Sequence, residues 1–303
     1  MKSILNKGLF ILTAAMLFLS IALPVQAEEV IDEKLGVPIV VYGGNLTDAQ
    51  LKQTKELLEI TDSQMLDEYK VTGEDLANYI DGNPQSRMFS SAKITREEKG
   101  KGLTIRVVTP ENITQVTSDM YANALLTAGV ENATVDVASP VKVTGHSALT
   151  GIYKAYDVEG EQLDKERMEL ANEELGIATD LVDKGLTQEQ VSELLTEIKK
   201  AISENKPATK EEVEQIVKEQ LDKLNISLSE ADRQMLIDLF EKMRNLNIDF
   251  EQVKNQLQDI ANTVKDKMDE LGLDEGFWQK VGTFFKDFFN SIGDFFSGLL
   301  GSE

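Results

Sequence analysis

The sequence contains no cysteine, and this absence excludes several kinds of site at once. Without thiols the chain has no disulfide, no thiolate zinc site and no cysteine nucleophile. A protein that folds without disulfide cross-links must obtain its stability from its hydrophobic core.

Basic residues are also in short supply. Lys and Arg number 31 against 53 Asp and Glu, which gives a net charge of −22. Nucleic acid is therefore not expected as a partner, because its binding depends on cationic side chains that neutralise phosphates. Long-range attraction to an anionic membrane is not expected either.

Residue patterns that identify a reaction are missing. The single histidine, His146, precedes Ser147, but neighbours in sequence seldom present a base and a nucleophile to one substrate, and no third acidic member is evident. The glycines of Gly43-Gly44 and Gly100-Lys-Gly102 are better explained as turns than as a phosphate-binding loop. The pattern of a calcium-binding loop is absent. We predict no metal, no cofactor and no catalytic residue.

The only long apolar run lies at the beginning of the chain. Lys2 and Lys7 precede an apolar stretch over 9–23, and Val25-Gln26-Ala27 ends it before Glu28. This is the pattern of a secretory signal peptide over 1–27, removed after Ala27. About 15 apolar residues are too few for a retained anchor, which needs about 20. The mature chain has 29 basic and 53 acidic residues, a net charge of −24.

Export of a protein without disulfides fits a bacterium with a single membrane. We therefore expect a secreted protein, or one on the extracellular face of the cell envelope of a Gram-positive bacterium.

Residues 28–158 combine strand and helix signals. Strands are predicted over 37–42, 69–71, 91–97, 103–109 and 133–138, and helices over 47–58, 72–81, 118–128 and 147–156. The glycine-containing stretch 99–102 between two strand-like runs indicates a hairpin. We expect an α+β or α/β domain with a mixed sheet, because a hairpin and helical crossovers occur together.

Residues 159–273 carry helix signals alone. Thr187-Gln-Glu-Gln190 and Thr209-Lys-Glu-Glu212 are capping boxes, and Ser229-Glu-Ala-Asp232 is a close variant. Apolar residues three and four apart follow each of them, and a narrow apolar seam runs from Phe250 to Leu271. This half is predicted to be an all-α helical array or bundle with highly charged outer faces.

Several contiguous words of the sequence point to a known family. They include Ser118-Asp-Met-Tyr-Ala-Asn-Ala-Leu-Leu-Thr-Ala-Gly129, Ala138-Ser-Pro-Val-Lys-Val-Thr-Gly145 and Ala148-Leu-Thr-Gly-Ile-Tyr-Lys-Ala-Tyr156, supported by Gly44-Asn-Leu-Thr-Asp-Ala-Gln50. Over about 37–185 the chain resembles the YpuA-like family of predicted exported proteins in Bacillus, Clostridium and their relatives, a domain of unknown function. The resemblance implies export and an envelope or extracellular location, with no established activity. His146 departs from the small hydroxyl residue usual at that position.

A candidate ligand site lies where a strand-like run enters a turn before the helix over 147–156. The first amides of this helix and the nearby hydroxyl groups can bind an anion. An ordinary helix cap accounts for the same pattern. The candidate residues are Thr144, Gly145, Ser147 and Ala148, with Tyr121 and Asn123 as possible neighbours.

The C-terminal segment 274–303 carries an apolar stripe, hereafter the Phe stripe, at helical spacing. It holds seven of the twelve Phe residues and the only Trp. Its members are Phe277, Trp278, Val281, Phe284, Phe285, Phe288, Phe289, Ile292, Phe295, Phe296, Leu299 and Leu300. They fall within an arc of about 160° at about 100° per residue, which predicts an amphipathic helix.

Three burial partners remain open for the Phe stripe: a membrane surface, another envelope protein, or the chain's own bundle and its copies. Lys280 and Lys286 are balanced by Asp287 and Asp294, so electrostatic recruitment to lipid is not available. Burial of the stripe is favourable by up to about 18–36 kcal/mol with any of these partners, so energy does not choose among them.

Together these patterns favour an exported envelope protein that binds a partner or surface and is not an enzyme. The alternative is a hydrolase or ligand-binding enzyme with its site near residues 144–148.

Overall fold

The structure, a computed structural model, describes residues 35–271. The predicted signal peptide and the Phe stripe lie outside the described residues. Five strands form one sheet: β1 (Ile39–Gly43), β2 (Asp67–Val71), β3 (Ser91–Arg96), β4 (Leu103–Val107) and β5 (Ala133–Ala138). The helices of the first half are α2 (Asp48–Leu57), α3 (Gly73–Ile80), α4 (Ser118–Ala128) and α5 (Ser147–Val158).

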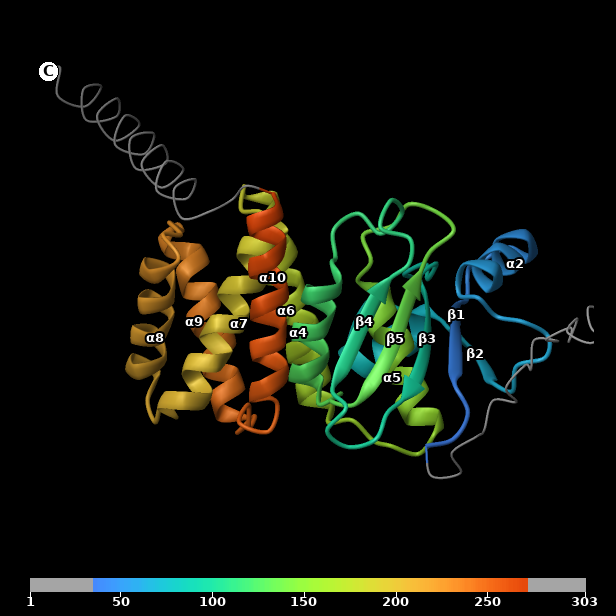
Figure 1. The fold of residues 1–303 in the computed structure, drawn as a ribbon, viewed down its shortest axis with the longest axis horizontal. Helices are drawn as coiled ribbons and strands as arrows, with labels where there is room; N and C mark the ends of the chain where they lie inside the picture. Colours follow the sequence, from blue (N-terminus) through green and yellow to red (C-terminus); the bar gives the residue numbers. More distant parts are fainter. Residues whose placement is uncertain (1–34, 272–303) are drawn as a thin grey trace, which may run out of the picture. The chain divides into compact units, whose positions relative to one another are not determined.

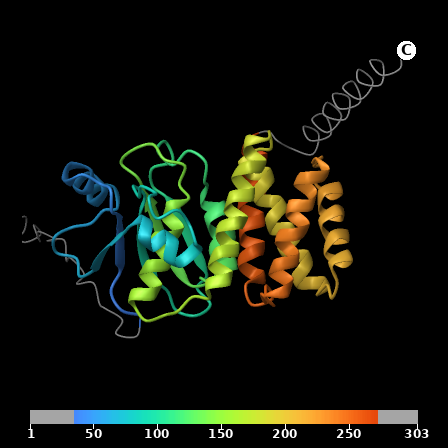
Figure 2. The same ribbon diagram turned by 180° about the vertical axis from the view of Figure 1, so that it is seen from behind.

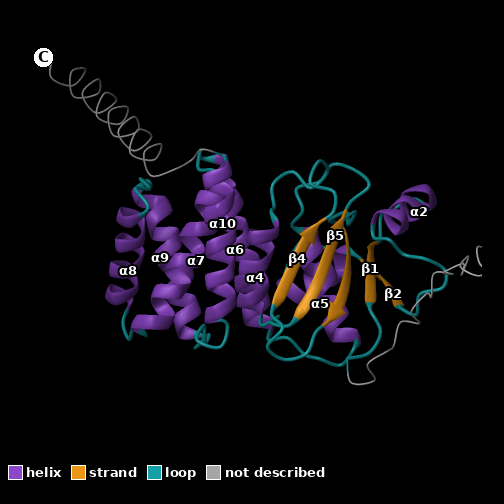
Figure 3. Ribbon diagram, viewed as in Figure 1, coloured by secondary structure: helices purple, strands orange, loops and turns teal. Residues whose placement is uncertain are grey.

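The second half of the described chain is helical. It comprises α6 (Lys165–Asp183), α7 (Gln188–Asn205), α8 (Lys210–Lys223), α9 (Glu230–Asn245) and α10 (Lys254–Glu270). Figure 3 shows the strands grouped in the first half and helices alone in the second. The predicted fold class, a mixed-sheet domain followed by an all-α array, is therefore confirmed.

The sheet has the strand order β2-β1-β3-β5-β4. β1 pairs with β2 and β4 with β5 in parallel, whereas β3 is antiparallel to both of its neighbours. The hairpin predicted between 91–97 and 103–109 is therefore wrong, because β5 lies between these two strands. The physical reason is burial: Val135 and Val137 of β5 are fully buried, while Thr104 and Arg106 of β4 are exposed. β5 therefore lies inside the sheet between β3 and β4, and β4 is left at the edge.

Helices cover one face of the sheet more fully than the other. Figure 2 shows α3 and α5 in front of the strands, and α4 packs beside β4. On the opposite face α2 covers a small cluster around Val40, Tyr42 and Leu58. Figure 1 shows β4 beside β5. Arg106 of β4 donates two hydrogen bonds, of 2.5 and 2.8 Å, to the Asp136 carboxylate of β5.

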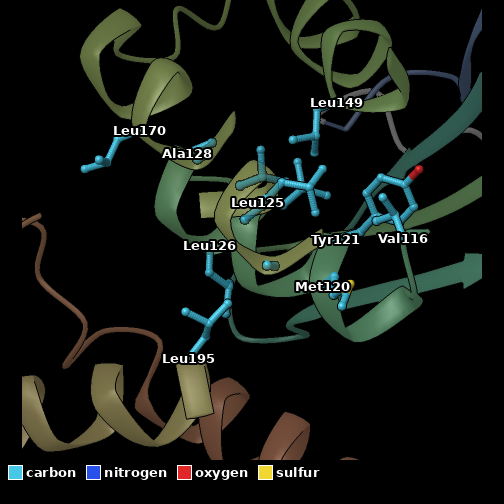
Figure 4. Close-up of a cluster of buried hydrophobic side chains, with 14 of the residues drawn as sticks. Val116, Met120, Tyr121, Leu125, Leu126, Ala128, Leu149, Leu170 and Leu195 are labelled. Carbon is cyan, nitrogen blue, oxygen red and sulfur yellow. The ribbon is translucent and has the colours of Figure 1, made fainter. Parts of the chain in front are cut away.

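Helix α4 joins the sheet to the helical array. Ten of its residues are buried, so its apolar side chains point in all directions. Figure 4 shows Tyr121 beside Val116 on one side of the helix and Leu126 directed toward Leu195 of α7 on the other. One hydrophobic cluster therefore runs from the sheet through α4 into α6, α7, α8 and α9.

Local signals explain where most helices begin. Thr47, Thr72 and Thr187 close complete capping boxes at the starts of α2, α3 and α7. Thr209 and Ser229 accept the expected amide hydrogen bond at the starts of α8 and α9. The seam of the last described helix is buried over most of its length, but Leu271 is 61% exposed because α10 has ended.

Candidate functional site

The turn predicted as a ligand site is formed around Gly145. Its φ of +111° suits glycine, and a Cβ here would lie 2.7 Å from Ile113 Cγ2 and 2.7 Å from Tyr121 Oη. The Tyr121 hydroxyl donates a 2.6 Å hydrogen bond to the Gly145 carbonyl. The structure therefore brings Tyr121 and Gly145 together, but the contact fills the space beneath the turn.

The start of α5 is largely occupied by protein groups. The amides of Ala148 and Leu149 donate to the carbonyls of Gly145 and His146. The N-cap residue is His146, and its side chain makes no capping hydrogen bond. Ala148 is buried, Ser147 is half-buried, and Thr144 is exposed. This arrangement favours a structural turn over an anion site.

His146 faces the helical array. Its Nε2 lies 3.2 Å from the Thr179 hydroxyl of α6. Burial lowers the pKa of the imidazole, because the charged form loses solvation. Its partner is a hydroxyl group and not a carboxylate, so the catalytic geometry of a base with an orienting acid is not formed by this pair.

Asn123 makes its side-chain hydrogen bonds away from the turn around Gly145. It lies two residues beyond Tyr121 on α4 and is directed into the helical array. Its side-chain amide donates to Thr196 Oγ1 at 2.9 Å, and its backbone carbonyl accepts a 2.8 Å hydrogen bond from Lys199 Nζ. Of the six predicted ligand-site residues, Asn123 is thus the one the structure separates from the others.

A buried polar cluster surrounds Lys199 at the contact of α4, α6 and α7. Lys199 Nζ lies 2.6 Å from Glu174 Oε1, with side-chain exposures of 0% and 1%. The other carboxylate oxygen accepts a 2.6 Å hydrogen bond from the Thr127 hydroxyl. Phe250 presents its ring 5.7 Å from the ammonium group. Both charged groups of the pair therefore have further partners besides each other, as a buried ion pair requires.

Burial shifts two pKa values in this cluster. It lowers the pKa of Lys199, although the Glu174 carboxylate acts in the opposite direction. It also raises the pKa of Tyr153, and Glu174 adds to the increase. The Tyr153 hydroxyl is buried without a hydrogen-bond partner among the described residues.

The sequence held a signal for this cluster. Lys199 follows Leu195 by four residues, and Glu174 follows Leu170 by four, so both charges stand on apolar faces of their helices. It is the position of Glu174 on the buried face that distinguishes it from Glu173, which is partly exposed and pairs with Lys242.

A polar groove, which the sequence did not predict, lies between β4 and α10. It encloses about 410 Å³ and is open to solvent. Its lining includes the apolar side chains of Leu103, Ile105, Ala122 and Ile260 and a larger number of polar ones. They are contributed by β4 and the preceding turn, by the start of α4 and by α10: Lys101, Thr104, Ser118, Asp119, Gln256, Asp259, Thr263 and Lys267.

Two further observations concern the described residues. Over 35–271, no helix has both the length and the apolar character that crossing a bilayer requires. The same part of the chain places no three His, Asp or Glu side chains where they would together hold a metal ion.

Comparison with known proteins places the chain in a family. The model of the family described as "Protein of unknown function (DUF1002)" matches residues 42–260. The chain belongs to the DUF1002 family. It is also 34% identical over 276 residues to the uncharacterized protein YpuA of Bacillus subtilis (strain 168), covering 88% of this chain and 91% of that protein. No solved structure matches the chain.

The resemblance to YpuA-like proteins is thus confirmed, but its predicted extent, 37–185, was too short. The DUF1002 match reaches Ile260, so α7, α8 and α9 belong to the family along with the sheet. The buried Lys199–Glu174 pair and the groove residues up to Ile260 lie within the matched part. Residues 274–303 lie beyond it.

Proposed function

We propose that this DUF1002 protein is an exported, non-enzymatic binding or scaffold protein of the Gram-positive cell envelope. Its C-terminal segment 274–303 attaches it to a membrane surface or to an envelope partner through the Phe stripe. The signal-peptide pattern over 1–27 supports export.

The observation that carries the attachment role concerns the surface of the described residues. Only four large apolar side chains are exposed there: Met65 at 65%, Val108 at 40%, Val158 at 36% and Leu271 at 61%. They stand on four different segments. The described surface therefore offers few apolar contacts for a stripe of twelve large apolar side chains.

Closure of the bundle by the stripe is correspondingly less favoured. Leu257, Val264 and Met268 of α10 are already buried in the array, and α10 packs along α7. The apolar faces of the described helices are thus covered by one another. A burial partner outside the described residues fits better.

Liposome flotation of the mature protein tests the proposal. We expect flotation with vesicles of zwitterionic lipid, and loss of flotation in a variant that ends at Leu273. Because the mature chain carries a charge of −24, anionic lipid should weaken flotation and not strengthen it.

Point variants of the full mature chain provide a matched control. The triple change Phe284→Ser, Phe288→Ser and Phe295→Ser should abolish flotation, while Lys280→Ser, Asn290→Ser and Asp294→Ser on the polar side should leave it intact. Size-exclusion chromatography of the same proteins detects self-association. If all forms stay in the soluble fraction and only oligomer size changes, attachment to lipid is excluded.

A further inference from the structure

The groove between β4 and α10 contains no residue of the attachment segment 274–303. In a β-strand, the backbone N–H and C=O of one residue point to the same side, and the side alternates along the strand. The amide of Val108 donates to Val137 of β5, and the carbonyl of Gly102 accepts from Ala133 of β5. By this alternation, the backbone N–H and C=O groups of Thr104 and Arg106 also point toward β5. Those of Leu103, Ile105 and Val107 point toward the groove.

Two of these three outward amides already have side-chain partners. Leu103 N–H donates to Gln256 Oε1 of α10 at 2.8 Å, and Val107 N–H donates to Ser118 Oγ at the start of α4 at 3.3 Å. Ile105 lies between them and lines the groove. Its amide has no side-chain or loop partner among the described residues. Along the β4 edge of the sheet, Ile105 is therefore the position whose outward N–H is unpaired, and this N–H and the Ile105 C=O face an open groove.

The dimensions of the groove follow from its two walls. Leu103 to Val107 spans about 13 Å at strand rise. On the α10 side, the wall runs from Gln256 to Lys267, a distance of about 16 Å at helix rise. Gln256 lies beside Leu103, and Lys267 pairs with Asp119, the neighbour of Ser118. In Figure 1, β4 and α10 run in the same direction. The groove thus has the length of about four or five extended residues.

We propose that this groove binds an extended peptide segment of a partner protein, which adds to the sheet at Ile105. Pairing with Ile105 requires a ligand that presents a donor and an acceptor side by side, as one residue of an antiparallel strand does. The groove walls carry hydroxyl, amide and charged groups beside the apolar side chains of Leu103, Ile105 and Ile260, so the peptide side chains that meet the polar groups are polar. Asp259 and Lys101 line the groove without an ion-pair partner among the described residues, and each offers a contact for the opposite charge.

The Phe stripe of the same chain is a poor occupant of this groove. Many of its twelve large apolar side chains would face the hydroxyl groups and charges of the lining, which would lose solvation without compensation. The partner is therefore a different kind of segment, polar and extended.

The structure suggests that Gln256 competes with the peptide. Its side-chain oxygen accepts the hydrogen bond of the outward Leu103 amide, next to the unpaired amide of Ile105. Removal of this side chain in Gln256→Ala would add one backbone hydrogen bond to the ligand. We expect binding to become about two- to tenfold tighter.

The probe for the experiment is a pool of linear peptides of about five residues, acetylated and amidated, drawn from Ala, Ser, Thr, Val, Lys and Glu. It is added to the ¹⁵N-labelled mature protein. We expect chemical-shift changes at the amides of Leu103, Ile105 and Val107, and slower hydrogen exchange at Ile105. A pool with N-methylated backbone amides should not produce these changes, because it cannot form the strand pairing.

A matched pair of α10 variants tests the place of binding. Thr263 and Asn262 are both exposed neighbours on α10, but only Thr263 lines the groove. Thr263→Trp should weaken binding by at least about tenfold by filling the groove, and Asn262→Trp should leave it unchanged. Strand addition is overturned if the amides from Leu103 to Val107 do not shift in the wild type and in Gln256→Ala. It is also overturned if the two Trp variants bind alike, or if N-methylated peptides bind equally well.

Failure of this inference is distinguishable from failure of the attachment proposal. The variant that ends at Leu273 should still bind peptide, and Thr263→Trp should still float with liposomes. Each site is thus tested in a protein that retains the other.

Discussion

Lys199 Nζ and Glu174 Oε1 lie 2.6 Å apart in a place where neither side chain has more than 1% exposure. The two residues stand on α7 and α6, and Thr127 and Asn123 of α4 complete their hydrogen bonds. The pair therefore links the helix that packs on the sheet to two helices of the array. Two buried charges pair well only in one arrangement of the three helices, which favours a single relative placement of them.

The first prediction concerns the loss of one charge of this pair. Lys199→Met leaves the Glu174 carboxylate buried with the Thr127 hydroxyl as its remaining partner. We expect the free energy of unfolding to fall by about 3–5 kcal/mol, measured by urea denaturation.

The double variant Lys199→Met with Glu174→Leu provides the control. It removes both charges, so it should be more stable than Lys199→Met alone despite carrying one more substitution. A double variant whose loss equals the sum of the two single losses would show that the pair is not coupled.

The second prediction uses Gly145. Gly145→Ala would place a Cβ against Tyr121 Oη and Ile113 Cγ2 at a φ of +111°. We expect a loss of about 2–4 kcal/mol in unfolding free energy, since strain and steric overlap act together. The matched change is Gly160→Ala, where φ is +81° and no atom lies within 4 Å of the new Cβ. It should cost about 1 kcal/mol. Equal losses in the two variants would contradict the contact with Tyr121.

The third prediction concerns the pH dependence of His146. Because burial lowers its folded-state pKa below the ordinary 6.5, the folded protein binds fewer protons than the unfolded chain in this range. The contribution of His146 to the free energy of unfolding is therefore fully present above pH 6.5. It is lost as the pH falls through the pKa of His146 in the folded protein. Since His146 is the only histidine, its ring-proton NMR titration needs no assignment, and its midpoint should lie below 6.5.

The variant His146→Gln separates this effect from the titration of the carboxylates. Gln retains a hydrogen-bonding group toward Thr179 and does not titrate. The stability of the wild type relative to this variant should decrease as the pH is lowered from 8 to about 5. A constant difference over that range would mean that His146 is protonated equally in both states.

The fourth prediction concerns processing of the first 27 residues. Expressed in a Gram-positive host, the protein should appear in the envelope or medium beginning at Glu28, as determined by mass spectrometry of the intact chain. Ala27→Asp should block cleavage, because the processing site requires a small uncharged residue. A chain that keeps Met1 and stays in the cytoplasm would contradict export.

Much of the fold was accessible from local patterns. Thr187 with Gln190 predicted a helix start that the structure has in the expected form. Such signals succeed because the capping groups lie within four residues of one another and need no tertiary partner. The strand at 133–138 was predicted at its exact bounds for a similar reason, as its composition is apolar and β-branched.

Strand pairing was not accessible in the same way. The turn between Arg96 and Leu103 resembles a hairpin, yet Asn132, from the loop before β5, accepts hydrogen bonds from the amides of Gly100 and Gly102. β5 then separates β3 from β4. A hairpin signal indicates only that the chain reverses its direction. Whether a third strand lies between the two flanking strands depends on residues about 30 positions away.

The sequence by itself determined the composition limits, the helix starts, the fold class, the family resemblance and the prediction of an amphipathic Phe stripe, because each depends on residues close together in the chain. The tertiary structure alone decided that Lys199 meets Glu174, that Tyr121 fills the turn at Gly145, and that β4 leaves Ile105 open beside α10. These relationships join residues from 24 to more than 150 positions apart. Their physical basis is the packing of α4 on all sides, which sets where the sheet edge and the helical array meet.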